Sequence, residues 1–139
     1  MRILITGACG FVGSELCFTL QDQLPNPQIT GIDNLSSRGI WRNLQRLEQG
    51  SIRVVHGDIR QDSDLESMEA QQWVIDAAAN PSMLAGVDGK ASSRQLLEHN
   101  LLGTVQVLEA CKRWGGGFTA VHQPGVLNPA TRSASSAGA

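Results

Sequence analysis

Tyrosine is absent from this sequence, and all aromatic residues together make up only 4% of it. No chemistry that needs a phenolic hydroxyl can therefore be carried by these residues. Runs of Lys or Arg are also absent and the formal net charge is −2, so nucleic acids and anionic membranes are not expected as partners. No apolar stretch is long enough to span a bilayer, and glycines interrupt the apolar start at once. These absences predict a cytoplasmic protein.

Cysteine is scarce, with Cys9, Cys17 and Cys111 as the three examples. They form no Cys-x-x-Cys pair and no histidine is spaced to complete a metal site, so no metal is expected. An odd count without a pattern favours free thiols in a reducing compartment. Cys9 has two readings: a reactive thiol, if a helix N-terminus lowers its pKa, or a small residue that merely fits. We favour the second.

The apolar content is sufficient for one domain, with 41% hydrophobic and 17% charged residues in a chain of 139. Short apolar segments alternate with segments of helical periodicity, which predicts an α/β fold with a doubly wound parallel sheet. Strands are expected over Arg2–Thr6, Gln28–Asp33, Ile52–His56 and Trp73–Asp76. Helices are expected over Phe11–Leu20, Ile40–Leu47, Asp62–Met68 and Ala91–Trp114.

A glycine motif, Gly7-x-x-Gly10-x-x-Gly13, lies between the first expected strand and the first expected helix. In a Rossmann-type fold, Gly7 would permit the tight turn, Gly10 would let a diphosphate approach the backbone, and Gly13 would let the helix pack close to the strand. Amide groups and the dipole at the helix start would favour the negative charge. The alternative is a purely structural strand-turn-helix that binds nothing.

Two carboxylates support a dinucleotide site. Asp33 ends the second strand, about 20 residues after the last loop glycine, where a carboxylate binds the adenosine ribose. Asp58 follows the third strand and is placed to accept a hydrogen bond from the adenine amino group. The alternatives are a turn cap for Asp33 and a helix N-cap for Asp58. Asp33 favours NAD over NADP because it repels a 2′-phosphate, although Arg38 could reach such a phosphate.

At these residues the sequence resembles the extended short-chain dehydrogenase/reductases, in particular the NAD-dependent epimerase/dehydratase family that acts on nucleotide sugars. Within that family, Asp76–Ser82 looks most like the branch of CDP-tyvelose (CDP-paratose 2-) epimerases. The resemblance covers roughly Met1–Phe118 and depends on motifs that occur in the family's order. These are Thr6–Gly13, Asp33–Ser36, Gly57–Arg60 and Asn100–Thr104.

The resemblance implies NAD as cofactor, a nucleotide sugar as substrate of the full-length family, and association into homodimers. Most relatives carry His at the position of Asp76, a difference of little consequence because that residue is mainly structural. The implied cofactor-binding residues are Gly7, Gly10, Phe11, Val12 and Gly13 at the diphosphate, Asp33 and Asn34 at the adenosine ribose, Asp58 and Ile59 at the adenine, Ala77, Ala78 and Ala79 after the fourth strand, and Asn100 near the active centre.

The family's catalytic residues are missing. In the family, a tyrosine removes a sugar hydroxyl proton while NAD accepts a hydride, and a lysine four residues later lowers the pKa of that tyrosine. A Ser or Thr after the fifth strand hydrogen-bonds the reacting oxygen. This chain has no tyrosine, and His122–Gly125 follows Phe118 where that Ser/Thr segment belongs. No catalytic residue is assigned. The chain is then the NAD-binding portion of a nucleotide-sugar epimerase/dehydratase, an inactive dinucleotide-binding fragment, or an NAD-responsive regulatory domain.

The end of the chain departs from the domain pattern. Residues 1–118 are expected to form a partial Rossmann domain that is incomplete at its C-terminal side, and residues 119–139 a disordered or aberrant tail. Suitable codons for Val121–Ala130, read from their second base, give Ser-Thr-Ser-Arg-Val-Tyr-Ser-Ile-Pro, which resembles the family's fifth-strand region. We therefore expect a truncated, frameshifted chain whose fifth strand is absent or replaced, leaving an unpaired sheet edge and marginal stability.

Overall fold

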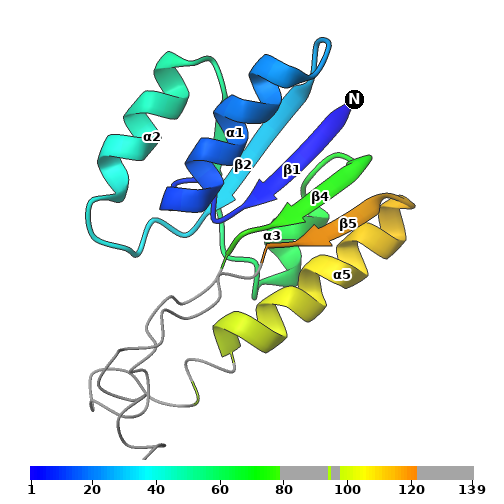
Figure 1. The fold of residues 1–139 in the computed structure, drawn as a ribbon. Helices are drawn as coiled ribbons and strands as arrows, with labels where there is room; N and C mark the ends of the chain where they lie inside the picture. The colour runs from blue at the N-terminus through cyan, green and yellow to red at the C-terminus, as the bar shows by residue number, and fades with distance from the viewer. Residues whose placement is uncertain (79–93, 95–97, 122–139) are drawn as a thin grey trace, which may run out of the picture.

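The computed structural model describes residues 1–78, 94 and 98–121. In this part, a five-stranded parallel sheet has the order β3-β2-β1-β4-β5, with all pairings parallel (Figure 1). This is the Rossmann-type α/β fold that the alternation of segments predicts. The strands are β1 (Arg2–Thr6), β2 (Gln28–Asp33), β3 (Arg53–His56), β4 (Trp73–Asp76) and β5 (Gly117–Ala120).

Helices cover both faces of the sheet (Figure 1). α1 (Phe11–Gln23) and α2 (Ile40–Gln49) lie on one face, and α3 (Asp62–Glu66) and α5 (Gly103–Trp114) lie on the other. The helix expected from Ala91 begins outside the described residues, and a π-helical turn, η1 (Glu98–Leu102), directly precedes α5.

Strand β1 shows why the apolar runs became central strands. Ile3 and Ile5 are buried in a cluster with residues of α1 and α2, such as Cys17. Leu4, between them, is buried in the opposite cluster with Val107 of α5. Successive side chains of a strand point to opposite faces, so a strand covered on both sides needs a continuous apolar run. This burial places β1 at the centre of the sheet.

The structure contains a fifth strand, β5, so the expectation that this strand is absent or replaced is wrong, and so is the expectation that β4 is left as an unpaired edge. β5 pairs with β4 in parallel, with Val74 opposite Phe118. The glycines before it make the turn: Gly115 ends α5 with φ of +68°, and a Cβ on Gly116 would lie 2.6 Å from the Gln71 carbonyl oxygen. The three successive glycines Gly115–Gly117, a composition typical of linkers, therefore form a tight connection between packed elements.

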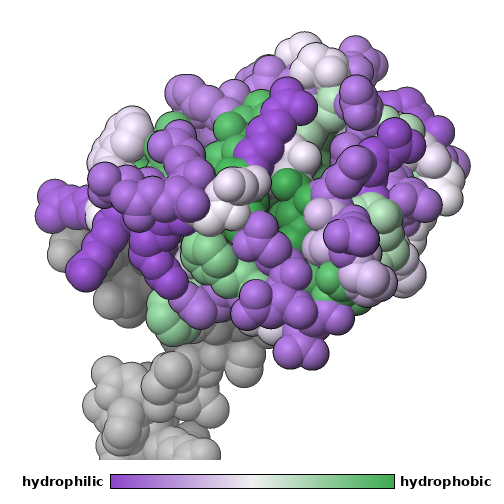
Figure 2. Space-filling view, turned by 90° about the horizontal axis from the view of Figure 1, so that it is seen from above, coloured by the Kyte–Doolittle hydropathy of each residue, from purple (hydrophilic) through white to green (hydrophobic). Residues whose placement is uncertain are grey.

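All five strands point the same way, so their carboxyl ends meet at one edge of the sheet. The opposite end, seen from above in Figure 2, is covered mostly by hydrophilic side chains, and hydrophobic ones show only in small areas between them. No helix among the residues that the structure describes is long and apolar enough to cross a membrane. Loops at the carboxyl edge form the site described next.

Candidate functional site

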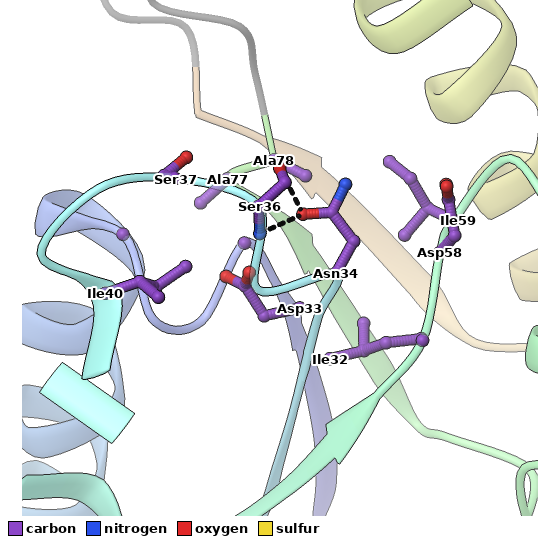
Figure 3. A pocket seen from close by; sticks show the side chains of 13 residues that line it. Ile32, Asp33, Asn34, Ser36, Ser37, Ile40, Asp58, Ile59, Ala77 and Ala78 are labelled. Carbon is purple, nitrogen blue, oxygen red and sulfur yellow. Dashed lines mark hydrogen bonds between the residues drawn. The ribbon is translucent and has the colours of Figure 1, made fainter. Parts of the chain in front are cut away.

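A hollow of about 230 Å³ lies at the carboxyl edge, where the loops after β1, β2, β3 and β4 meet. This edge is where open α/β sheets bind their ligands. Asp33 and Asp58 lie on either side of Asn34 in Figure 3, and Ala77 and Ala78 approach from β4. The hollow is lined by Gly7, Gly10, Ile32, Asp33, Asn34, Ser36, Ser37, Ile40, Gly57, Asp58, Ile59, Ala77 and Ala78.

Two of the motif glycines are required by the packing of the loop itself. Gly7 has φ of +60°, and a Cβ on it would lie 2.8 Å from the carbonyl oxygen of Ala77. A Cβ on Gly13 would lie 2.1 Å from the carbonyl oxygen of Gly7. Both residues therefore match the tight turn and the close helix–strand packing that the sequence predicts. A purely structural loop would need these two glycines as well.

Gly10 differs from the other two glycines. Its φ of −69° is open to any residue. Among the residues that the structure describes, a Cβ there would meet the Gly7 carbonyl oxygen alone, at 3.2 Å, which is a tight contact. Gly10 is the N-cap residue of α1 and has no side chain with which to cap the amides of this helix start. Backbone conformation does not demand glycine here, and a Cβ would need only a small shift of the Gly7 carbonyl. Close approach of a ligand to these amides would favour glycine more strongly.

Asp33 joins the glycine loop to the turn after β2. It is 8% exposed, and its Oδ2 accepts a hydrogen bond of 3.0 Å from the amide of Cys9. Its Oδ1 accepts one of 2.9 Å from the amide of Leu35. The turn-capping reading of Asp33 is thus confirmed. Each carboxylate oxygen has two lone pairs, so these bonds leave acceptor capacity for a ligand.

Asn34 is held by the same turn. Its Oδ1 accepts hydrogen bonds from the amide and the hydroxyl of Ser36, at 3.2 and 2.8 Å (Figure 3). Ser36 and Ser37 line the hollow, although sequence reasoning did not select them. The signal was available, because hydroxyl residues directly after the acidic strand end lie at the same edge.

Asp58 accepts hydrogen bonds from Arg60 rather than capping a helix. The backbone amide and Nε of Arg60 donate to its Oδ1 at 2.9 and 3.0 Å, and Nη2 donates to its Oδ2 at 2.6 Å. α3 begins later, at Asp62, with Gln61 in its N-cap position. The N-cap alternative for Asp58 is therefore wrong. Ile59 lies beside it, 8% exposed, and a Cβ on Gly103 would lie 2.7 Å from its Cδ1.

A buried network beneath Ala77 and Ala78 fixes the fourth side of the hollow. Asp76 is 4% exposed and accepts hydrogen bonds from the hydroxyls of Thr6 and Thr104, the latter at 2.8 Å. The Ala78 amide donates to the Thr6 hydroxyl at 3.1 Å. Asp76 therefore joins β1, β4 and α5, in agreement with the structural role expected for it. Sequence reasoning did not select the two threonines, which lie far from Asp76 along the chain.

Some predicted site residues do not line the hollow. Phe11 is 81% exposed at the start of α1, and Val12 is half-buried there. Asn100 is exposed within η1. Gly13 lies behind the loop, against Gly7. Ala79 lies outside the described residues.

The cysteines are buried and free. Burial, with a contribution from the nearby Asp33 charge, raises the pKa of the Cys9 thiol to about 12. The reactive-thiol reading of Cys9 is therefore wrong, because at neutral pH its nucleophilic thiolate is almost unpopulated. Among the residues with described positions, no group of three or more His, Cys, Asp or Glu side chains could hold a metal ion.

Comparison with known proteins identifies the family. The family model of the NAD dependent epimerase/dehydratase family matches residues 3–125. CDP-paratose 2-epimerase of Salmonella typhi is 31% identical over 128 residues, which are 88% of this chain and 36% of that protein.

Solved structures agree with the sequence comparison. UDP-glucuronic acid 4-epimerase of Bacillus cereus in complex with NAD has 30% identity and a TM-score of 0.68, covering 86% of this chain and 39% of that one. UDP-glucose 4-epimerase of Thermus thermophilus in complex with NAD has 28% identity and a TM-score of 0.66, covering 83% and 35%. The chain thus spans little more than a third of each of these relatives. With the glycine loop and the two carboxylates at the matching edge of the sheet, this chain belongs to the NAD-dependent epimerase/dehydratase family.

Proposed function

We propose that this chain binds NAD at the carboxyl edge of the sheet, with the diphosphate at the glycine loop and the adenosine between Asp33 and Asp58. Gly10 carries this proposal, because its φ does not require a glycine and a Cβ would need only a small shift of the Gly7 carbonyl, while the amides at the start of α1 offer donors to an anion. The relatives solved with NAD support the choice of cofactor. The proposed contacts are Gly7, Gly10, Phe11, Val12, Gly13, Asp33, Asn34, Asp58, Ile59, Ala77, Ala78, Ala79 and Asn100.

NAD is preferred to NADP in this proposal. The Asp33 carboxylate is buried at the hollow and would repel a 2′-phosphate. Arg38 is exposed, and its guanidinium would offset this repulsion only if the side chain turned towards the hollow. Titration calorimetry of the chain with each dinucleotide tests the proposal. NAD is expected to bind at least about tenfold more tightly, a difference of about 1.4 kcal/mol. Equal affinities, or binding of neither dinucleotide, would contradict it.

For the whole protein, we infer a nucleotide-sugar epimerase or dehydratase, of which this chain is the cofactor-binding portion. Bound NAD would supply a hydride acceptor at the sugar carbon. The names of three relatives, CDP-paratose 2-epimerase, UDP-glucose 4-epimerase and dTDP-glucose 4,6-dehydratase, support this substrate class. A cytoplasmic location and a homodimer remain predictions. The exposure of Leu101, Val105 and Leu108 on η1 and α5 gives the homodimer an apolar surface on which to form.

A second candidate function, the binding of NAD without turnover, is favoured by the absence of tyrosine from the sequence. A chain without a phenolic hydroxyl cannot use the family's proton transfer, so these residues alone would bind NAD without turnover. Incubation with NAD and CDP-, UDP- or dTDP-sugars, followed at 340 nm and by chromatography of the sugars, separates the two candidates. The expected result is binding without product. A sugar product would show that another group replaces the tyrosine.

A further inference from the structure

Arg60 fixes the carboxylate of Asp58 at the base end of the hollow. Its Nε lies 3.0 and 3.1 Å from the two carboxylate oxygens, its Nη2 lies 2.6 Å from Oδ2, and its backbone amide lies 2.9 Å from Oδ1. A planar guanidinium that contacts both oxygens fixes the rotation of a carboxylate, which a single point charge does not. Asp58 also raises the pKa of Arg60, so the guanidinium remains charged.

A second ion pair extends from Arg60 to the segment that precedes α5. Its Nη1 lies 3.9 Å from Oε2 of Glu98 in η1. Glu98 also accepts a hydrogen bond of 2.7 Å from Nε of Arg94. Nearby, Ile59 packs where Gly103 leaves room for it. Arg60 is thus held from two sides, and its side chain is 31% exposed against 22% for Asp58. A partly exposed ion pair of this kind contributes little to stability by itself, so the geometry of the Arg60–Asp58 pair is its more informative property.

We propose that Arg60 is a positioning residue, which holds the Asp58 carboxylate in the orientation that accepts a hydrogen bond from the adenine amino group. This inference rests on the proposed binding of NAD. A preoriented carboxylate loses no rotational freedom when the base arrives, whereas a freely rotating one does. Arg60 would therefore determine how strongly the hollow prefers adenine to a base without the amino group, rather than how strongly it binds dinucleotides in general.

The test compares NAD with nicotinamide hypoxanthine dinucleotide, which lacks the adenine amino group. Titration calorimetry on the full 139-residue chain gives the ratio of the two dissociation constants. The unsubstituted chain is expected to prefer NAD by about tenfold, the usual size of one hydrogen bond to a charged group. Arg60→Gln is expected to lower this preference to about twofold or less by weakening NAD binding alone. Arg60→Lys keeps the charge without the paired geometry and should give an intermediate ratio.

Two further variants control for loss of charge and for folding. Arg46→Gln removes an exposed guanidinium that pairs with Glu15 at 3.4 Å and does not line the hollow, so the preference should stay unchanged. Glu98→Gln leaves the Arg60–Asp58 contacts in place and should lower the preference by less than Arg60→Gln does. Circular dichroism melts report whether each variant folds. If Arg60→Gln does not fold, the dinucleotide preference of Arg60→Lys tests the inference instead.

Three results would overturn the inference. Equal weakening of both dinucleotides by Arg60→Gln would mean a structural role only. An unchanged preference in a folded Arg60→Gln variant, or no preference in the unsubstituted chain, would mean that Asp58 is not positioned for the amino group by Arg60. If the unsubstituted chain bound neither dinucleotide, the proposed function itself would be wrong and the inference would fall with it. That result differs from binding without base preference.

Discussion

Asp76 illustrates how much one buried side chain supports at this site. Its carboxylate accepts hydroxyl hydrogen bonds from Thr6 on β1 and Thr104 on α5, and Thr6 in turn accepts one from the amide of Ala78. Asp76→Ala would leave the buried Thr6 hydroxyl and the partly buried Thr104 hydroxyl without this acceptor. The expected cost is about 2–3 kcal/mol of unfolding free energy, measured by urea denaturation. Thr19→Ala on exposed α1 surface is the matched control and should change stability little. A cost no larger than that of the control would contradict the network.

Cysteine ionisation gives a second prediction at the residue scale. Burial raises the pKa of both Cys9 and Cys17 to about 12 in the folded chain, from 9.0 as the ordinary value. A raised pKa means that the folded state holds its protons more tightly than the unfolded state. The contribution to stability is therefore complete below pH 9 and is lost as the pH rises towards 12. Urea unfolding at steps from pH 8 to pH 11.5 should show the free energy of unfolding falling.

The doubly substituted chain, Cys9→Ala with Cys17→Ala, isolates this effect because all other titrating groups are retained. Its free energy of unfolding should fall less steeply above pH 9 than that of the parent chain. Parallel pH curves for the two chains would show that the thiols titrate alike in both states. In the parent chain, Ellman's reagent should label the Cys9 and Cys17 thiols slowly until the chain unfolds.

At the scale of elements, the turn from α5 to β5 depends on glycine for two different reasons. Gly115 needs its positive φ but has open space around it, whereas a Cβ on Gly116 would meet the Gln71 backbone at 2.6 Å. Gly115→Ala should cost about 1 kcal/mol through backbone strain. Gly116→Ala should cost more, because β4 and β5 must separate to admit the methyl group. Thermal melts of the two variants test this order, and a Gly116 variant as stable as the parent would argue against the β4–β5 pairing.

Some elements could be predicted from sequence because their pattern has one physical meaning. β1 is read directly from an apolar run that is buried on both faces, and α1 follows from apolar residues at helical spacing. β5 could not be predicted in this way. Three successive glycines are typical of a linker, and it is the packing against Gln71 and Trp73 that makes them a turn. The π-helical turn of η1 likewise leaves no pattern in the sequence.

At the scale of the whole molecule, part of the candidate site could be predicted from the sequence and part could not. Gly7, Gly10, Asp33 and Asp58 line the hollow, because residues that directly follow parallel strands meet at one edge of the sheet. The Arg60–Asp58 pair and the Thr6–Asp76–Thr104 network were not predicted. Thr6, Asp76 and Thr104 come from different elements, so only the folded chain brings them into contact. Arg60 and Asp58 are two residues apart, and their contacts replace the helix cap that the sequence offers for Asp58.

At the scale of the whole site, we propose that the amides at the start of α1 receive a diphosphate, which Gly10 admits because it has no side chain. Titration calorimetry of Gly10→Ala with NAD, alongside the parent chain, tests this most directly. The variant is expected to fold with a loss of about 1 kcal/mol of stability or less and to bind NAD at least about tenfold more weakly. Gly13→Ala, whose Cβ would lie 2.1 Å from the Gly7 carbonyl oxygen, should instead destabilise the fold. A folded Gly10→Ala chain that binds NAD as tightly as the parent would contradict the account.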